Sequence, residues 1–129
     1  MKLFILLLLL VSTAYNQYPR LPDYRRQRCA DETNAYRSHY AKQHSIANMN
    51  KLDYNPELEQ KLLDKWASIE QCPDTSVKYE DGFVFGLNVK NSKGLIHNLA
   101  SNAGSMEIAC IETTGCEDVP VLSIVMDFG

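Results

Sequence analysis

The chain lacks three features that would assign a function directly: a second long apolar run, a Gly-x-Ser-x-Gly motif and an Asn-x-Ser/Thr sequon. The first absence excludes a transmembrane helix beyond the N-terminus, because such a helix takes about 20 apolar residues. The second removes a common signature of serine hydrolases, and without the third we expect no N-glycans. There is also no internal repeat and no low-complexity segment.

Positive charge is also in short supply, since 13 Lys and Arg face 16 Asp and Glu, for a net charge of −3. A mildly acidic protein has no broad electrostatic attraction for nucleic acid or for anionic membranes. Its 129 residues are enough for one domain and not for two.

The chain opens with MKLFILLLLLVSTA, which places Lys2 before an apolar run over residues 3–11 and small residues at 12–14. The run is too short to cross a bilayer, and the pattern is typical of a secretory signal peptide. We therefore predict that residues 1–14 are a signal peptide and that the protein is secreted, extracellular and soluble, without stable membrane insertion.

Four cysteines follow the signal peptide: Cys29, Cys72, Cys110 and Cys116. An even number in an oxidising compartment predicts two disulfides, and four cysteines can be paired in three ways. A catalytic cysteine would need an unpaired thiol and a nearby base. We therefore expect no cysteine nucleophile.

Residues 15–28 contain two prolines, four arginines and no apolar period. This composition predicts a basic disordered tail. The alternative is a propeptide, because Arg25-Arg26-Gln27-Arg28 fits a minimal R-x-x-R processing site. In either case we expect the folded domain to span residues 29–129.

Helix signals occur in three places. Asp31 is a candidate N-cap for a first helix that ends near residues 48–50, and Asn55 followed by Pro56 starts a second that Cys72-Pro73 stops. Ser92 caps a short third helix that ends at Gly104.

Strand signals dominate the second half of the chain. Residues 83–85 are bounded by turn residues, and residues 106–112 and 120–128 are the clearest strands. In the last of these, the even-numbered residues from 122 to 128 are apolar on one face, and Val121 and Val125 line the other. Helices first and doubly covered strands last predict an α+β layered domain.

Three stretches, taken in order, carry a family resemblance: TNAYR at 33–37, MNKLDYNPELEQKLLDKWASIEQC at 49–72, and SMEIACIETTGC at 105–116. Together they resemble the CAP superfamily (SCP domain), which comprises cysteine-rich secretory proteins, antigen 5 and pathogenesis-related proteins. The likeness is strongest to its venom-allergen-like branch. The resemblance implies a shortened α-β-α sandwich, with a small antiparallel sheet flanked by helices and two disulfides.

Many members of that family hold a divalent metal with two histidines and two glutamates. When these positions are carried over one by one, Ser76 stands at the position of the first histidine and Leu87 at that of the first glutamate. The helix that carries the second glutamate is missing. His97 is a weak remnant of the second histidine. A single candidate ligand cannot form a zinc site, and His39 and His44 lie about 140° apart on a helix. We therefore expect no metal and no cofactor.

The resemblance also implies a disulfide pairing, Cys72 with Cys116. Cys29 and Cys110 are then left to form the second bridge. The alternative pair, Cys110 with Cys116, would close a small local loop and stabilise the fold less.

These observations predict a secreted non-enzymatic CAP-type protein, an extracellular interaction or binding module with no catalytic residues. Its partner would be an unknown extracellular protein or a small apolar ligand, and not nucleic acid. One alternative is a sterol or lipid binder whose groove is lined by residues 83–85 and 95–96; another is a degenerate paralogue without retained activity. A hydrolase is not favoured, because no Ser-His-Asp or Cys-His arrangement with a supporting motif is present.

Overall fold

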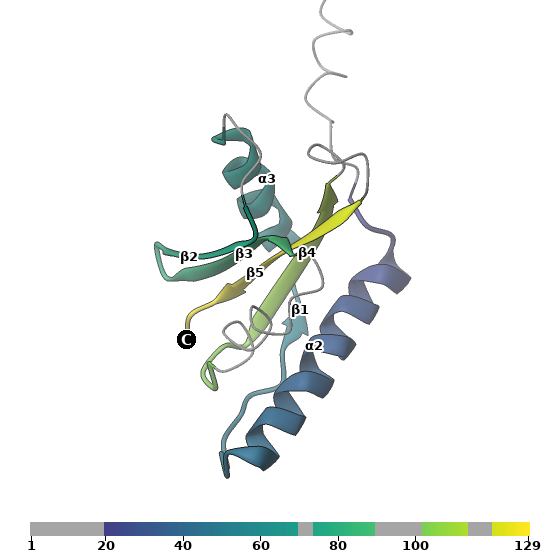
Figure 1. Cartoon of the computed structure of the whole chain (residues 1–129). Helices are drawn as coiled ribbons and strands as arrows, with labels where there is room; N and C mark the ends of the chain where they lie inside the picture. The colour runs from purple at the N-terminus through teal and green to yellow at the C-terminus, as the bar shows by residue number, and fades with distance from the viewer. Residues whose placement is uncertain (1–19, 70–73, 90–101, 114–119) are drawn as a thin grey trace, which may run out of the picture.

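The computed structural model describes residues 20–69, 74–89, 102–113 and 120–129. Along the chain (Figure 1) these form α2 (Asp23–Gln43), β1 (Asp53–Tyr54), the 3-10 turn η1 (Pro56–Leu58), α3 (Glu59–Ala67), β2 (Ser76–Glu80), β3 (Phe83–Val89), β4 (Glu107–Thr113) and β5 (Val121–Asp127). Among the described residues, no helix has both the length and the apolar character that crossing a membrane requires.

The strands form one five-stranded sheet in the order β1-β4-β5-β3-β2. β1 runs parallel to β4, and every other neighbouring pair is antiparallel. The sheet is therefore mixed, which corrects the antiparallel sheet expected from the resemblance. β1 has only two residues, so the sequence shows no strand alternation there. Its pairing with β4 is seen in two hydrogen bonds: Asp53 N–H donates to the Met106 carbonyl and Asn55 N–H to the Ile108 carbonyl, both at 2.9 Å.

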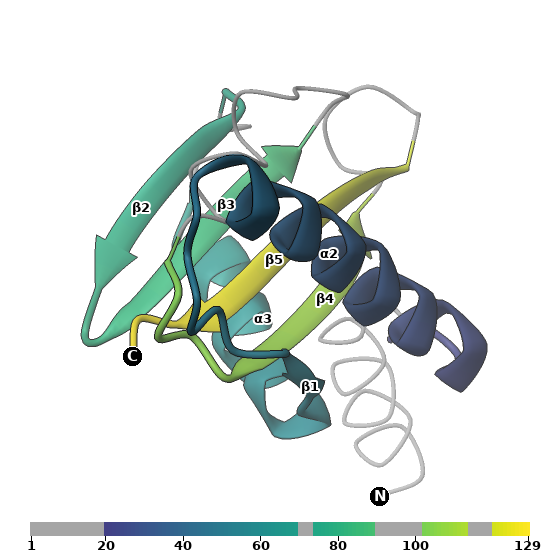
Figure 2. The same cartoon turned by 90° about the horizontal axis from the view of Figure 1, so that it is seen from below.

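The two helices cover opposite faces of the sheet, α2 on one and α3 on the other (Figure 2). Successive side chains of a strand point to opposite faces of the sheet, so the strands contribute side chains to two hydrophobic cores, one on each face. The α2-side core contains Leu21, Cys29, Ala30, Leu52, Val84, Ile108, Cys110, Ile124 and Met126. The α3-side core contains Leu58, Leu62, Trp66, Phe85, Leu87, Ala109, Ile111 and Val125. The domain is thus α+β with three layers.

The clearest sequence signals are confirmed. β4 and β5 match the two predicted strands within a residue or two, and Val125 faces the α3-side core while Ile124 and Met126 face the α2-side core. Asn55 caps η1 by accepting the Glu57 N–H at 3.0 Å. α3 ends at Ala67, earlier than predicted, and β2 was not predicted. The expected third helix falls mostly on residues outside those described.

The predicted tail over residues 15–28 is wrong for residues 23–28, which form the first turns of α2. All four of its arginines meet carboxylates: Arg20 and Arg26 pair with Glu59 at 3.3 and 2.8 Å, Arg25 with Glu112, and Arg28 with Glu32 at 3.0 Å. Leu21 is buried in the α2-side core. The folded domain therefore begins before Cys29, because Leu21 is buried in the core and Arg26 pairs with the buried Glu59 carboxylate.

Arg37, from the TNAYR stretch, connects α2 to two loops, one that contains Asn50 and one that contains residues 102–105. Its side chain is only 1% exposed. It donates to the carbonyls of Asn50 (2.9 and 3.2 Å), Asn102 (2.8 Å) and Ser105 (3.3 Å). Burial lowers the pKa of Arg37, and the negative charge of Asp127 works against that shift.

Replacing Arg37 by Met is expected to cost about 3 kcal/mol or more of unfolding free energy. The substitution leaves buried carbonyl oxygens without a donor, and hydrogen bonds from charged donors contribute about 1.5–3 kcal/mol each. Urea unfolding followed by circular dichroism measures the change. The matched control is Arg28→Met, at an exposed arginine, which should change stability by less than about 1 kcal/mol. Equal effects of the two variants would contradict the tying role of Arg37.

Candidate functional site

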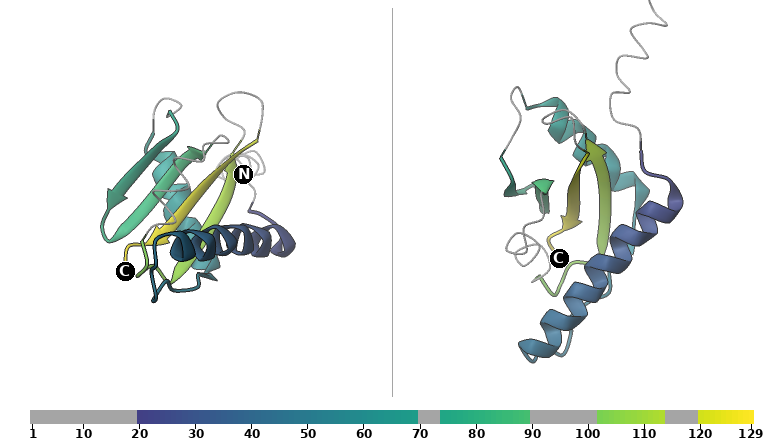
Figure 3. Two further views of the ribbon diagram at one scale, coloured as in Figure 1. Left: turned by 60° about the horizontal axis from the view of Figure 1, so that its bottom comes forward. Right: turned by 45° about the vertical axis from the view of Figure 1, so that its right-hand side comes forward.

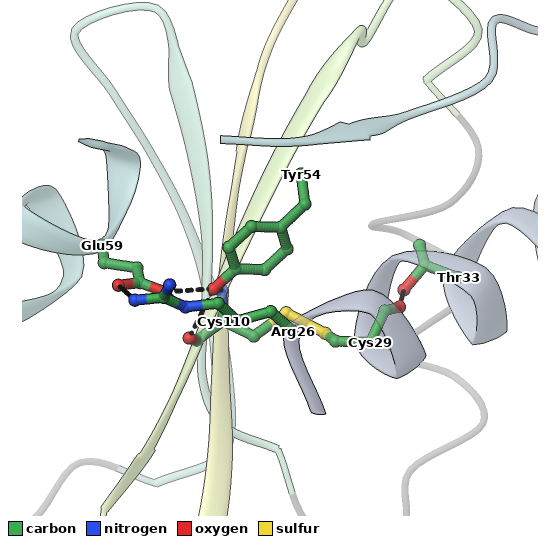
Figure 4. The surroundings of a disulfide bond; sticks show 6 residues. All are labelled: Arg26, Cys29, Thr33, Tyr54, Glu59 and Cys110. Atoms are coloured by element: carbon green, nitrogen blue, oxygen red, sulfur yellow. Dashed lines mark hydrogen bonds and ion pairs between the residues drawn. A yellow bond between two sulfur atoms is a disulfide. The ribbon is translucent and has the colours of Figure 1, made fainter. Parts of the chain in front are cut away.

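The most organised polar group in the described structure surrounds Glu59, the first residue of α3 (Figure 4). Its side chain is 0% exposed. Arg26, from α2, donates Nε to one carboxylate oxygen and Nη2 to the other, both at 2.8 Å. Such two-pronged pairing is among the strongest hydrogen-bonded arrangements of charged side chains. It joins the helices of the two outer layers directly.

Tyr54, on β1, completes this group. Its hydroxyl donates to Glu59 and accepts the backbone N–H of Cys110 at 3.1 Å. Burial and the bond to Glu59 raise the pKa of Tyr54 well above the usual value for tyrosine, although the Cys110 backbone and the Arg26 charge act in the opposite direction. Arg20 adds a further donor to Glu59 at 3.3 Å.

A disulfide between Cys29 and Cys110 lies beside this group and links α2 to β4. It is the pair that the resemblance left over for the second bridge. Cys29 is 7% exposed and Cys110 is 0% exposed. Cys72 and Cys116, the other expected pair, lie outside the described residues. We refer to Arg26, Tyr54, Glu59 and the Cys29–Cys110 bridge as the β1-edge lock.

The β1-edge lock is built to hold structure rather than to react. Both oxygens of Glu59 accept hydrogen bonds from buried or half-buried donors, and the carboxylate has no exposed surface. A general acid or base must instead reach a substrate proton, directly or through one water. The chemistry of this group is therefore charge pairing between layers.

Sequence reasoning missed Glu59, Tyr54 and Arg26. One signal was present: Glu59 lies three residues before Leu62 and seven before Trp66, so it falls on the apolar stripe of its helix. An acid at such a position needs a buried partner. Nothing local in the sequence identifies Arg26, 33 residues away, as that partner.

Ser76 and Leu87, which stand at two ligand positions of the resembled family, are brought together by the fold. They are directly paired across β2 and β3, and so lie on the same face of the sheet. Leu87 is 0% exposed and belongs to the α3-side core. His97 lies outside the described residues.

The other candidate ligands do not converge. His39 is exposed on α2, and His44 caps that helix with its ring 4.2 Å from the Tyr40 ring. Glu107 accepts a hydrogen bond from Asn55 at 3.0 Å. Within the described ranges, no three His, Cys, Asp or Glu side chains are grouped to hold a metal ion.

Of the residues expected to line an apolar groove, 95–96 lie outside the described residues, and residues 83–85 do not share one face. Val84 faces the α2-side core while Phe85 faces the α3-side core, because neighbours on a strand alternate. Phe83 and Phe85 line a cleft of about 290 Å³ against α3, with the Lys61 ammonium 4.4 Å from the Phe83 ring. A separate groove of about 180 Å³ lies on the α2 side, lined by Cys29, Glu32, Thr33, Tyr36, Val89, Leu122, Ile124 and Met126.

Comparisons with known proteins return no match: no family model, no curated protein and no solved structure is significantly similar to this chain. The fold and the β1-edge lock still define a class, a small disulfide-bridged α+β domain with a mixed five-stranded sheet. Membership of a particular family is a proposal that rests on the sequence motifs.

The raised pKa of Tyr54 makes stability depend on alkaline pH. The folded state keeps the Tyr54 proton above the usual tyrosine pKa of about 10, where the unfolded state loses it. The stabilisation that the Tyr54 hydroxyl contributes is therefore fully present below about pH 10. Above that pH the unfolding free energy falls by up to about 1.4 kcal/mol per pH unit. Urea unfolding of the wild type and of Tyr54→Phe, from about pH 8 to about pH 11, should show a shallower decline in the variant. Parallel curves would contradict the buried position of the hydroxyl.

Proposed function

We propose that the chain is a secreted, non-enzymatic CAP-type domain that acts as an extracellular binding module and has lost the family's metal site. The observation that carries the proposal is the cross-strand pair of Ser76 and Leu87. A histidine and a glutamate placed opposite each other on one face would be near enough to share an ion. Here a hydroxyl and a core leucine take their places.

The motifs behind the resemblance support this proposal through what their residues do. Asn34 donates to the Leu52 carbonyl at 2.9 Å and accepts the Leu52 N–H at 2.8 Å, so its amide pairs like a strand backbone. Arg37 bonds three loop carbonyls. Trp66 packs in the α3-side core. The motif residues that match the family thus serve the scaffold, whereas Ser76 and Leu87, which stand at two of its ligand positions, lie outside these motifs.

Export is the second part of the proposal. A buried disulfide of 81-residue separation fits an oxidising compartment, and the N-terminal sequence pattern fits a signal peptide. We infer that Cys72 and Cys116 form a second bridge. Peptide mapping of the secreted protein distinguishes this pairing from a Cys110–Cys116 bridge.

A small apolar ligand remains the second candidate function, with the groove beside Cys29 as its site. The groove holds about 180 Å³, below the roughly 300–1,000 Å³ of pockets that bury drug-sized ligands. A short acyl group suits that volume better than a sterol. We therefore place protein binding first.

Zinc titration of the full secreted chain tests the loss of the metal site. Isothermal calorimetry should show no stoichiometric binding at micromolar zinc, and His97→Ala should leave the metal content of the purified protein unchanged. Stoichiometric micromolar binding would overturn the proposal.

The role of Leu87 gives a matched test that needs no metal. Because Leu87 is fully buried in the core, Leu87→Ala should lower the unfolding free energy of the protein by about 2–5 kcal/mol. Leu63→Ala, at a partly buried leucine beside the same core, is the control and should cost less. Equal, small losses would indicate that Leu87 borders open space rather than core.

A further inference from the structure

The strand β2 forms the outer edge of the sheet, with β3 as its neighbour (Figure 3, left). Its last three residues, Lys78, Tyr79 and Glu80, are exposed. An edge strand presents a row of backbone donors and acceptors that can pair with another chain. The other end of the sheet differs, because there β1 and its surroundings are held by the β1-edge lock.

The hairpin geometry identifies which backbone groups face outward. Asp81 and Gly82 form a two-residue turn with φ of 52° and 81°, and Glu80 pairs with Phe83 across it. In such a hairpin, the pair that closes the turn is hydrogen-bonded, and bonded pairs alternate with non-bonded pairs along the ladder. The N–H and C=O groups of Tyr79 and Val77 therefore point away from β3.

The charges on this edge are symmetric about Tyr79. Lys78 precedes it and Glu80, which also pairs with Lys65 of α3, follows it. Both lie on the α3 side because their partners are Phe85 and Phe83. If two copies pair antiparallel with Tyr79 on the two-fold axis, Lys78 of each copy lies opposite Glu80 of the other. Opposite charges placed directly across a strand pair are stabilising, and like charges are destabilising.

An exposed aromatic pair lies on the other side of the same edge. Tyr79 is 60% exposed and Phe128 is 50% exposed, and their rings meet edge to face with centroids 5.3 Å apart. Around a two-fold axis at Tyr79, the pairs of both copies would gather into one apolar cluster. Aromatic side chains are enriched at the centres of interfaces.

We propose that the protein forms a two-fold homodimer through antiparallel pairing of β2 with β2 of a second copy, centred on Tyr79. The charge pattern favours this register, because centring the pair on Lys78 would place two lysines face to face. The two sheets become one continuous sheet, and the interface is the same on both subunits. The dimer rests on β2 alone and not on the family assignment.

Charge reversal tests the dimer. Sedimentation equilibrium of the full, disulfide-bonded chain from low to high micromolar concentration should give the dimer mass for the wild type. Lys78→Glu and Glu80→Lys each place like charges opposite one another twice, which should weaken dimerisation by more than about tenfold. The double variant carrying both changes restores opposite charges and should dimerise again. Lys42→Glu, at an exposed lysine on α2, is the control and should stay dimeric.

Mixing the two single variants gives the sharpest result. A copy with Glu at 78 and 80 complements a copy with Lys at both, so the mixture should form heterodimers while each variant alone stays monomeric. Thermal unfolding of each variant checks that it is folded. A monomeric wild type would overturn the proposal, and so would a Glu80→Lys variant that dimerises like the wild type. In the latter case the copies meet at another register or another surface.

Discussion

Burial of the Glu59 carboxylate is the constraint on which the rest of the structure depends. A buried charge is costly unless it is paired and hydrogen-bonded, and Arg26 and Tyr54 supply those bonds. Arg26 can reach Glu59 only if the chain before Cys29 is already helical. Tyr54 can reach it only if β1 lies against β4, where its hydroxyl also accepts the Cys110 N–H. One carboxylate therefore couples both helices and one end of the sheet.

The two ends of the sheet are consequently different surfaces. At the β1 end, ion pairs, hydrogen bonds and the Cys29–Cys110 bridge fasten α2 to β4. At the β2 end, exposed charged and aromatic side chains surround an edge strand. A binding module needs a rigid scaffold and an accessible surface. For the binding module that we propose, these two features lie at opposite ends of the same sheet.

The sequence was informative where the pattern is local. Alternation in residues 120–128 predicted both faces of β5, and Asn55-Pro56 predicted the start of the second helix. It failed where long-range partners decide the outcome: Arg25 and Arg26 looked solvated because the acids they meet, Glu112 and Glu59, lie far along the chain. β2 was missed although Val77 and Tyr79 alternate with polar residues over 76–80, and without β2 the pairing of Ser76 with Leu87 could not be foreseen. The prediction that Leu87 is no ligand needed only its residue type, whereas the β1-edge lock needed the fold.

A double-mutant cycle on Arg26 and Glu59 tests the central role of the buried carboxylate most directly. Arg26→Met should cost about 3–5 kcal/mol of unfolding free energy in urea, because it removes the charged partner of the buried Glu59 carboxylate. Glu59→Gln should also destabilise the fold, because it removes the charge with which Arg26 pairs. The double variant should cost less than the sum of the two by about 1–3 kcal/mol, since the residues act as one unit. Costs that add within about 0.5 kcal/mol would show that the two residues act independently, and would contradict the coupling of the two helical layers through Glu59.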